Sequence, residues 1–310
     1  MTATASSSPK LRVDTRGTNE LPPHLDENLL TPRFYVTEFK KAAKTELTDA
    51  REEFEAMLSE MKADYNCTHF DRKASLDRLQ ELPQKAKETY ESYLVRSVIS
   101  EFSGFLLFKE ISNRLKKEGN RDLGKLFQFL ARDEARHAGF LSRALVAEGI
   151  EVDLPHLGGK RAATWFPISW VIYSVYLSEK IGYWRYILMD RHLKANPGEA
   201  FAPLFDFFEP WCQDENRHGD CFTVMMRCWP GITKGWRGKL LSRFFLWSVF
   251  LTHTLTVCER GEFYELLGIE PKEFDEEVIK RTNHTSKNAF PWVFNLEDNR
   301  FWDLRNNIIE

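Results

Sequence analysis

Apolar residues recur at intervals of three and four along most of the chain, which is the pattern of amphipathic helices. The four longest such stretches cover roughly residues 84–117, 121–148, 167–195 and 200–229. Further helices are expected over residues 37–64 and 236–266, and no stretch of useful length alternates as a strand would. Pro83, Gly119 and Gly149 fall between these stretches, where such residues start or stop helices. The chain therefore predicts an all-α fold built on a large helix bundle.

The helical stretches divide the chain into four parts. Residues 1–30 are polar, rich in Ser and Thr, and lack the apolar segment of a secretory signal, so we expect a disordered leader. Residues 31–83 are expected to form an N-terminal helical extension, and residues 84–230 a four-helix bundle. Residues 231–310 are then expected to form a C-terminal helical extension packed on the bundle.

Composition narrows the class of protein. The 310 residues are 43% apolar and 14% aromatic, which suits a thick helical core, and the net charge of −3 argues against nucleic-acid binding. The five cysteines form no Cys-x-x-Cys pair, so a disulfide framework or zinc ribbon is not expected and a reducing compartment is favoured. The longest uncharged apolar stretch, residues 244–258, is shorter than the roughly 20 residues that a spanning helix needs. A soluble or peripherally membrane-bound protein is expected.

Two matching pentads carry the candidate chemistry. Residues 133–137 read Asp-Glu-Ala-Arg-His and residues 214–218 read Asp-Glu-Asn-Arg-His, each within a predicted helix. Residues three apart share one helix face, so the Glu and His of each pentad can reach the same metal pair. A single Glu-x-x-His more often marks a solvated helix face, but two copies of the whole pentad, 81 residues apart, favour a metal site. The candidate ligands from the pentads are Glu134, His137, Glu215 and His218.

A di-iron bundle takes one further Glu from each of its two other helices. The helix before each pentad helix offers such a residue, Glu101 in the first case and Glu179 in the second. Each lies on an otherwise apolar stripe, where a lone carboxylate is costly to bury unless it is paired or bound to metal. Four carboxylates and two histidines exceed the usual tetrahedral zinc site. The sequence therefore predicts a ferritin-like four-helix bundle that binds two iron ions, with manganese as a less favoured metal.

The remaining charged residues of the pentads are expected to support the ligands. They are Asp133 and Arg136 in the first pentad, and Asp214 and Arg217 in the second. Each Arg lies three residues after its Asp and can pair with it, as on an ordinary helix surface. A metal-bound His usually donates its other ring N–H to a carboxylate or carbonyl. Because each His must turn towards the metal, we expect Asp133 to accept from His218, and Asp214 from His137.

At these motifs the chain resembles the aerobic magnesium-protoporphyrin IX monomethyl ester oxidative cyclase family. The resemblance covers roughly residues 30–295, with a weaker match over 260–280. The matching segments are TPRFY from Thr31, EFSGFLL from Glu101, DEARHAGFL from Asp133, YLSEKIGYWRY from Tyr176 and WCQDENRHGD from Trp211. These motifs are long, and are more specific than the spacing of di-iron ligands in general.

The resemblance implies a reaction and a set of partners. The family closes the fifth, isocyclic ring of chlorophyll and bacteriochlorophyll precursors, by oxidising a methylpropionate side chain through alcohol and ketone stages to give divinyl protochlorophyllide. It implies Glu101, Glu134, His137, Glu179, Glu215 and His218 as iron ligands, dioxygen as co-substrate and a magnesium porphyrin as substrate. Because the sequence has no nicotinamide-binding motif and no iron–sulfur cysteine spacing, electrons must come from a ferredoxin or an NADPH-linked reductase. Contact with the cytoplasmic side of a photosynthetic or plasma membrane, and with a small auxiliary subunit, is also implied.

Two other functions remain open from the residues alone. One is a di-iron hydroxylase or desaturase acting on a lipid-like substrate. The other is a ferritin-like iron-binding protein, which would leave the residues after 230 unexplained. Oxygen-dependent turnover of a magnesium porphyrin distinguishes these functions.

Overall fold

The computed structural model describes residues 13–14, 35–36, 38–44, 50–70, 76, 82–155 and 164–309. Most of this part of the chain is helical and very little is strand, which confirms the predicted all-α class. The predicted leader, residues 1–30, lies outside the described residues except for Val13–Asp14.

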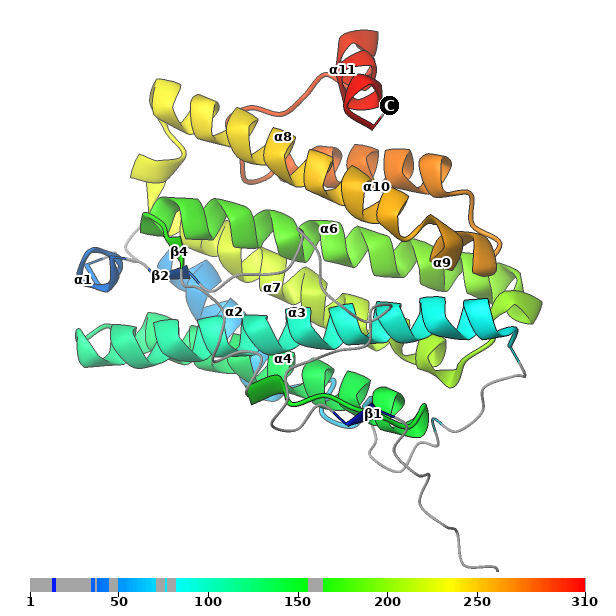
Figure 1. Ribbon diagram of the computed structural model, residues 1–310. Helices are drawn as coiled ribbons and strands as arrows, with labels where there is room; N and C mark the ends of the chain where they lie inside the picture. The colour runs from blue at the N-terminus through cyan, green and yellow to red at the C-terminus, as the bar shows by residue number, and fades with distance from the viewer. Residues whose placement is uncertain are drawn as a thin grey trace, which may run out of the picture.

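Four long helices form the centre of the molecule (Figure 1). They are α3 (Gln84–Lys117), α4 (Arg121–Ala147), α6 (Ile168–Ala195) and α7 (Phe208–Cys228). The most extensive packing is within the pairs α3–α4 and α6–α7, and α4 also contacts α7. Leu94, Leu126, Tyr176 and Trp211 are fully or almost fully buried in the resulting core. The four helices thus enclose their apolar faces and bring the two pentad helices together.

The turn between α3 and α4 follows from its sequence. Gly119 has φ +96°, a left-handed conformation that glycine adopts without steric cost. The Asn120 side chain accepts a hydrogen bond from the backbone N–H of Leu123 at 3.1 Å, which caps the start of α4. The short turn places α3 and α4 side by side in opposite directions.

The predicted helix over residues 200–229 is wrong in its first turns. Residues 197–199 and 203–207 form the short 3₁₀ helices η2 (Pro197–Glu199) and η3 (Pro203–Phe207), and α7 begins only at Phe208. Pro210 has no backbone N–H to donate to a carbonyl one turn earlier, so the helix cannot extend regularly towards its N-terminus. A further 3₁₀ helix, η4 (Pro230–Ile232), follows α7.

Two other predicted helices are interrupted. The helix predicted over residues 37–64 is described as α1 (Phe39–Ala42) and α2 (Arg51–Ala63), and α1 is followed by a turn at Ala43 and Lys44. Residues 37 and 45–49 of this prediction lie outside the described residues. The helix predicted over residues 236–266 divides at Arg260 into α8 (Gly235–Glu259) and α9 (Gly261–Leu266). The break lets Phe263 of α9 stack on Tyr93 of α3, with ring centroids 4.1 Å apart.

The C-terminal helices form a further layer on one side of the bundle (Figure 1). Helices α8 and α10 (Pro271–Ser286) pack on α6, α9 packs on α3, and α11 (Asn299–Ile309) packs on α8. On the other side, α2 contacts α4 and α7. Two pairs of two-residue parallel strands join distant segments: β1 (Val13–Asp14) with β3 (Ile150–Glu151), and β2 (Tyr35–Val36) with β4 (Thr164–Trp165).

Candidate metal centre

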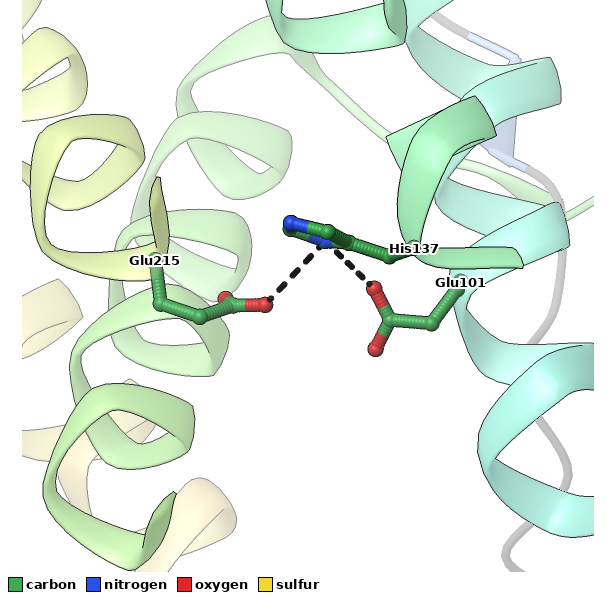
Figure 2. A group of neighbouring side chains, drawn as sticks. All are labelled: Glu101, His137 and Glu215. Carbon is green, nitrogen blue, oxygen red and sulfur yellow. Dashed lines mark hydrogen bonds and ion pairs between the residues drawn. The ribbon is translucent and has the colours of Figure 1, made fainter. Parts of the chain in front are cut away.

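The four bundle helices bring all six candidate ligands together in the interior. They form two groups of three side chains, and within each group the candidate ligand atoms lie within 4.8 Å of one another. The first group is Glu101, His137 and Glu215, drawn in Figure 2, and the second is Glu134, Glu179 and His218. Each group contains two carboxylates and one imidazole, and both are buried.

In the first group, the ring nitrogen Nδ1 of His137 faces both carboxylates (Figure 2). It lies 3.1 Å from Oε2 of Glu101 and 3.8 Å from Oε1 of Glu215. These side chains come from α3, α4 and α7, so the group depends on the packing of three helices.

The second group repeats this arrangement with the helices exchanged. Nδ1 of His218 lies 3.2 Å from Oε1 of Glu134 and 3.2 Å from Oε2 of Glu179. The Glu of each pentad therefore lies with the His of the other pentad, not with its own. Glu215 also contacts Glu179 of the second group, so the two groups are in direct contact.

The electrostatics of the cluster favour a bound cation. Burial, together with the negative charges of Glu101 and Glu179, raises the pKa of Glu134 well above its usual value. Burial, followed by the charges of Glu179, Glu101 and Glu134, does the same to the pKa of Glu215. Burial lowers the pKa of His137, but its hydrogen bonds with Asp214 and Glu101 outweigh this and raise it to about 10. Glu134, Glu215 and His137 thus tend to hold protons, which metal cations would displace.

The second nitrogen of each imidazole points to the Asp of the opposite pentad. Nε2 of His137 lies 3.1 Å from Oδ2 of Asp214, and Nε2 of His218 lies 3.5 Å from Oδ2 of Asp133. The first distance is a hydrogen bond, whereas the second is too long for good hydrogen-bond geometry. A proton on Nε2 leaves Nδ1 free to bind a metal, so these contacts support the tautomer that the site needs.

Both pentad aspartates form ion pairs with arginines, but only Asp214 is bound most closely by the arginine of its own pentad. Arg217 pairs with Asp214 at 2.5 Å, as expected. Asp133 is bound most closely by its neighbour Arg132, at 2.8 Å, and Arg136 lies at 3.3 Å from it. Arg136 instead makes its shorter contact, of 2.6 Å, with Asp64 after α2.

Besides Arg132 and Asp64, three elements of the site were missed by the sequence reasoning. The side-chain amide of Asn66 donates to Oδ1 of Asp214 at 2.8 Å, and nothing in its sequence context indicated this. Nε1 of Trp211 donates to Oε1 of Glu215 at 2.9 Å, and its position four residues before that Glu was a usable signal. A glycine also follows each lone Glu by three residues, Gly104 after Glu101 and Gly182 after Glu179.

These two glycines make room for the pentad carboxylates. A Cβ atom at Gly104 would lie 3.1 Å from Oε2 of Glu134, and a Cβ at Gly182 would lie 3.5 Å from Oε2 of Glu215. The first distance is tighter than ordinary van der Waals contact, and the second is ordinary contact. Gly104 is therefore the position where a side chain would displace a candidate ligand.

The donor set fits a pair of hard or borderline metal ions. Oxygen and imidazole donors without thiolates suit iron or manganese, and the buried cysteines Cys212 and Cys221 are not part of either group. A rubrerythrin family model matches residues 92–226, which include all six candidate ligands. The fold and the site thus define a ferritin-like oxidoreductase of the di-iron class.

Similar proteins place the chain within this class. It is 74% identical over 309 residues to a magnesium-protoporphyrin IX monomethyl ester [oxidative] cyclase of Prochlorococcus marinus strain SARG, covering 100% of this chain and 88% of the relative. Magnesium-protoporphyrin IX monomethyl ester [oxidative] cyclase 2 of Thermosynechococcus vestitus is 51% identical over 285 residues, covering 92% of this chain and 80% of the relative. The chain belongs to the magnesium-protoporphyrin IX monomethyl ester oxidative cyclase family, as its motifs predicted. No solved structure matches it.

Proposed function

We propose that this protein catalyses the oxygen-dependent closure of the isocyclic ring, converting magnesium-protoporphyrin IX monomethyl ester to divinyl protochlorophyllide. The observation that carries the proposal is the pair of buried Glu₂His groups in a chain 74% identical to a protein described as this cyclase. The alternatives, a hydroxylase or desaturase of lipid-like substrates and a ferritin-like iron-binding protein, have no comparable support.

The six side chains of the two groups are the proposed ligands of two iron ions. Glu101, His137 and Glu215 would hold one ion, and Glu134, Glu179 and His218 the other. Bound iron would supply the capacity to activate dioxygen. The protein's own contribution is to fix the ligands and to exclude water around them.

Aromatic side chains pack around both imidazoles and exclude water from them. Phe70 and Trp211 lie 5.4 Å and 5.6 Å from His137 between ring centroids, and Phe108 lies 6.4 Å from His218. All three aromatic residues are buried. The exclusion of water strengthens the electrostatic interactions inside the site and protects reactive species from side reactions.

Electrons for the reaction are proposed to come from a ferredoxin or an NADPH-linked reductase. The chain has five cysteines, without the spacing of an iron–sulfur site and without a nicotinamide-binding motif. A small auxiliary subunit is a further proposed partner.

The first half of α8 is the proposed contact with the cytoplasmic side of a photosynthetic or plasma membrane. Trp236, Leu240 and Phe244 are exposed there, with Trp236 69% exposed. Four cations accompany them, namely Lys234, Arg237, Lys239 and Arg243, all exposed and without an ion pair among the described residues. Exposed aromatic and aliphatic side chains beside basic residues are typical of helices that lie in the interface of anionic membranes.

By length and composition α8 could span a bilayer, contrary to the expectation from its short uncharged stretch. The helix has 25 residues and is long and apolar enough to cross a membrane, although its uncharged part is shorter. However, one face of α8 packs against α6 and α10, with Phe245, Leu246 and Phe250 buried. Spanning would break this packing, so we propose attachment along the surface.

Turnover of a defined substrate tests the proposed activity. Purified, iron-loaded protein would be supplied with magnesium-protoporphyrin IX monomethyl ester, dioxygen and reduced ferredoxin, and the product followed by the absorption and fluorescence of protochlorophyllide. Protochlorophyllide that forms only with oxygen, reductant and iron supports the proposal. Reproducible iron loading and reduction without any change in the porphyrin, in the presence of membranes, would contradict it.

A further inference from the structure

Three arginines meet where α3, α6 and the start of α9 come together. Arg96 lies on α3, Arg185 on α6 and Arg260 between α8 and α9. The Nε atom of each is buried and has no hydrogen-bond partner among the described residues. Buried donors without partners are uncommon in folded proteins, so three in one place require an explanation.

The cluster carries more positive charge than its surroundings neutralise. Arg96 pairs with Glu259 at 2.7 Å. Within the described residues, neither Arg185 nor Arg260 forms an ion pair with any carboxylate. Burial, followed by the positive charges of Arg185 and Arg96, lowers the pKa of Arg260. An arginine remains charged in proteins, so the cluster holds an uncompensated charge that an anion would stabilise.

Tyrosine side chains line the cluster without supplying a negative charge. The guanidinium of Arg185 lies 4.7 Å from the ring centroid of Tyr186 and donates to its hydroxyl at 3.1 Å. The guanidinium of Arg260 lies 5.9 Å from the ring centroid of Tyr93. Burial, the largest effect at both phenols, helps to raise the pKa of Tyr93 and Tyr186 above the usual value, so both stay neutral.

A short chain of contacts joins the cluster to the candidate metal centre. The ring of Tyr186 stacks on Trp211 with centroids 4.2 Å apart, and Trp211 donates its Nε1–H to Glu215 at 2.9 Å. Tyr186 also lies seven residues after Glu179 on the same helix, which places both residues on one face about 10 Å apart along the axis. The cluster is thus within the reach of one large ligand that also approaches the metals.

We propose that Arg185 and Arg260, aided by Arg96, bind the free propionate carboxylate of the magnesium porphyrin. This inference rests on the proposed function. Of the two propionate groups of the porphyrin, one is esterified and reacts, whereas the other remains an anion. Guanidinium groups bind carboxylates through paired, charge-assisted hydrogen bonds. Anchoring the unreactive carboxylate at the arginines would orient the esterified side chain towards the metals.

A comparison of two esters tests the proposal directly. The probes are magnesium-protoporphyrin IX monomethyl ester and its dimethyl ester, which lacks the free carboxylate. Binding to the iron-loaded protein would be measured by quenching of tryptophan fluorescence. The unaltered protein should bind the monomethyl ester roughly 10- to 100-fold more tightly than the dimethyl ester. In Arg185→Gln and Arg260→Gln the preference should shrink towards one, and Arg260→Lys should keep part of it.

Arg281→Gln is the matched control. Arg281 also lies over an aromatic ring, 5.6 Å from the centroid of Trp184, but it pairs with Glu277 on the surface. Its loss should leave both affinities unchanged. Equal affinity of the unaltered protein for the two esters, or an equal loss of both in the variants, would overturn the arginine site while turnover of the porphyrin still stood. Binding of neither ester by the unaltered protein would overturn the proposed function and the arginine site together.

Discussion

Nε2 of His137 lies 3.1 Å from Oδ2 of Asp214, so the two pentads are joined across the bundle by a buried hydrogen bond. Asp214 is held in place by Asn66 at 2.8 Å and by Arg217 at 2.5 Å. Burial alone would raise the pKa of Asp214. The hydrogen bond from His137 and the nearby cationic side chains together outweigh burial, so the net pKa is below its usual value and Asp214 remains ionised. A fixed, ionised acceptor orients the imidazole and increases the basicity of its free nitrogen.

The two aspartates should differ in importance. Asp214→Asn should weaken iron binding or activity roughly 10- to 100-fold. Asp133→Asn should have a smaller effect, because Oδ2 of Asp133 lies 3.5 Å from Nε2 of His218. Competition with a chelator would measure the iron affinities. Equal or reversed effects of the two changes would be inconsistent with the unequal distances.

Loss of a candidate ligand should remove metal without unfolding the bundle. The unaltered protein should bind about two irons per chain. Glu134→Ala and His218→Ala should each lower the iron content and abolish turnover while circular dichroism retains the helical signal. Asp122→Ala, a half-buried position at the start of α4 that pairs with Arg51, is a suitable control. Full activity of either ligand variant in an iron-free sample would refute the assignment.

Gly104 should be intolerant of even one methyl group. In Gly104→Ala the new Cβ would meet Oε2 of Glu134 at 3.1 Å, so the carboxylate must shift and the iron content should fall. Gly182→Ala should be milder, because its nearest contact is 3.5 Å. Gly139→Ala on α4 meets nothing within 4 Å and should retain iron, with a helix stabilised by up to about 1 kcal/mol. The same iron content in all three variants would show that Glu134 has room to move.

Attachment to membranes should depend on the first half of α8. Trp236→Ala with Phe244→Ala should reduce binding to vesicles that contain anionic lipid, and Lys239→Glu should reduce it further at low salt. Leu304→Ala, an exposed apolar position on α11, should have no effect. High-salt or carbonate washing should release the protein from membranes. Retention through both washes, with release by detergent alone, would instead indicate an integral helix.

A buried histidine outside the metal centre should make stability depend on pH. Nδ1 of His253 lies 2.7 Å from Oδ1 of Asp275. Burial lowers the pKa of His253 below 6.5, with Arg185 and Arg305 acting in the same direction and Asp275 against it. The folded protein therefore holds His253 neutral, whereas the unfolded chain takes up a proton as the pH falls below about 6.5. The free energy of unfolding should decrease over this range.

His253→Asn isolates this effect, because its amide can still donate to Asp275 but does not titrate. The difference in unfolding free energy between the variant and the unaltered protein should change between pH 7.5 and 5 by at most about 1.4 kcal/mol per pH unit. Chemical denaturation of iron-loaded samples at several pH values would measure it. A difference that is constant with pH would mean that His253 does not titrate in this range.

The sequence alone determined much of the fold and the composition of the site. The bounds of α3 were predicted without error because Pro83 and Gly119 mark its ends and its apolar stripe is continuous. The duplicated pentads, with Glu101 and Glu179 on the preceding helices, named the six residues that the structure gathers into two groups. Such local signals survive folding, because helix periodicity and helix termini depend on residues close together in the chain.

Only the tertiary structure decided which atoms meet. In the folded protein the Glu of each pentad lies with the His of the other pentad. Asp133 pairs most closely with Arg132, and Asn66 binds Asp214 from a distant part of the chain. The arginine cluster likewise brings together Arg96, Arg185 and Arg260, which are far apart in the sequence. Periodicity shows which face of a helix is buried, but the rotation and separation of packed helices arise from the interlocking of many side chains. A shift of about 1 Å in that packing is enough to break a hydrogen bond, and no local pattern in the sequence encodes the packing to this precision.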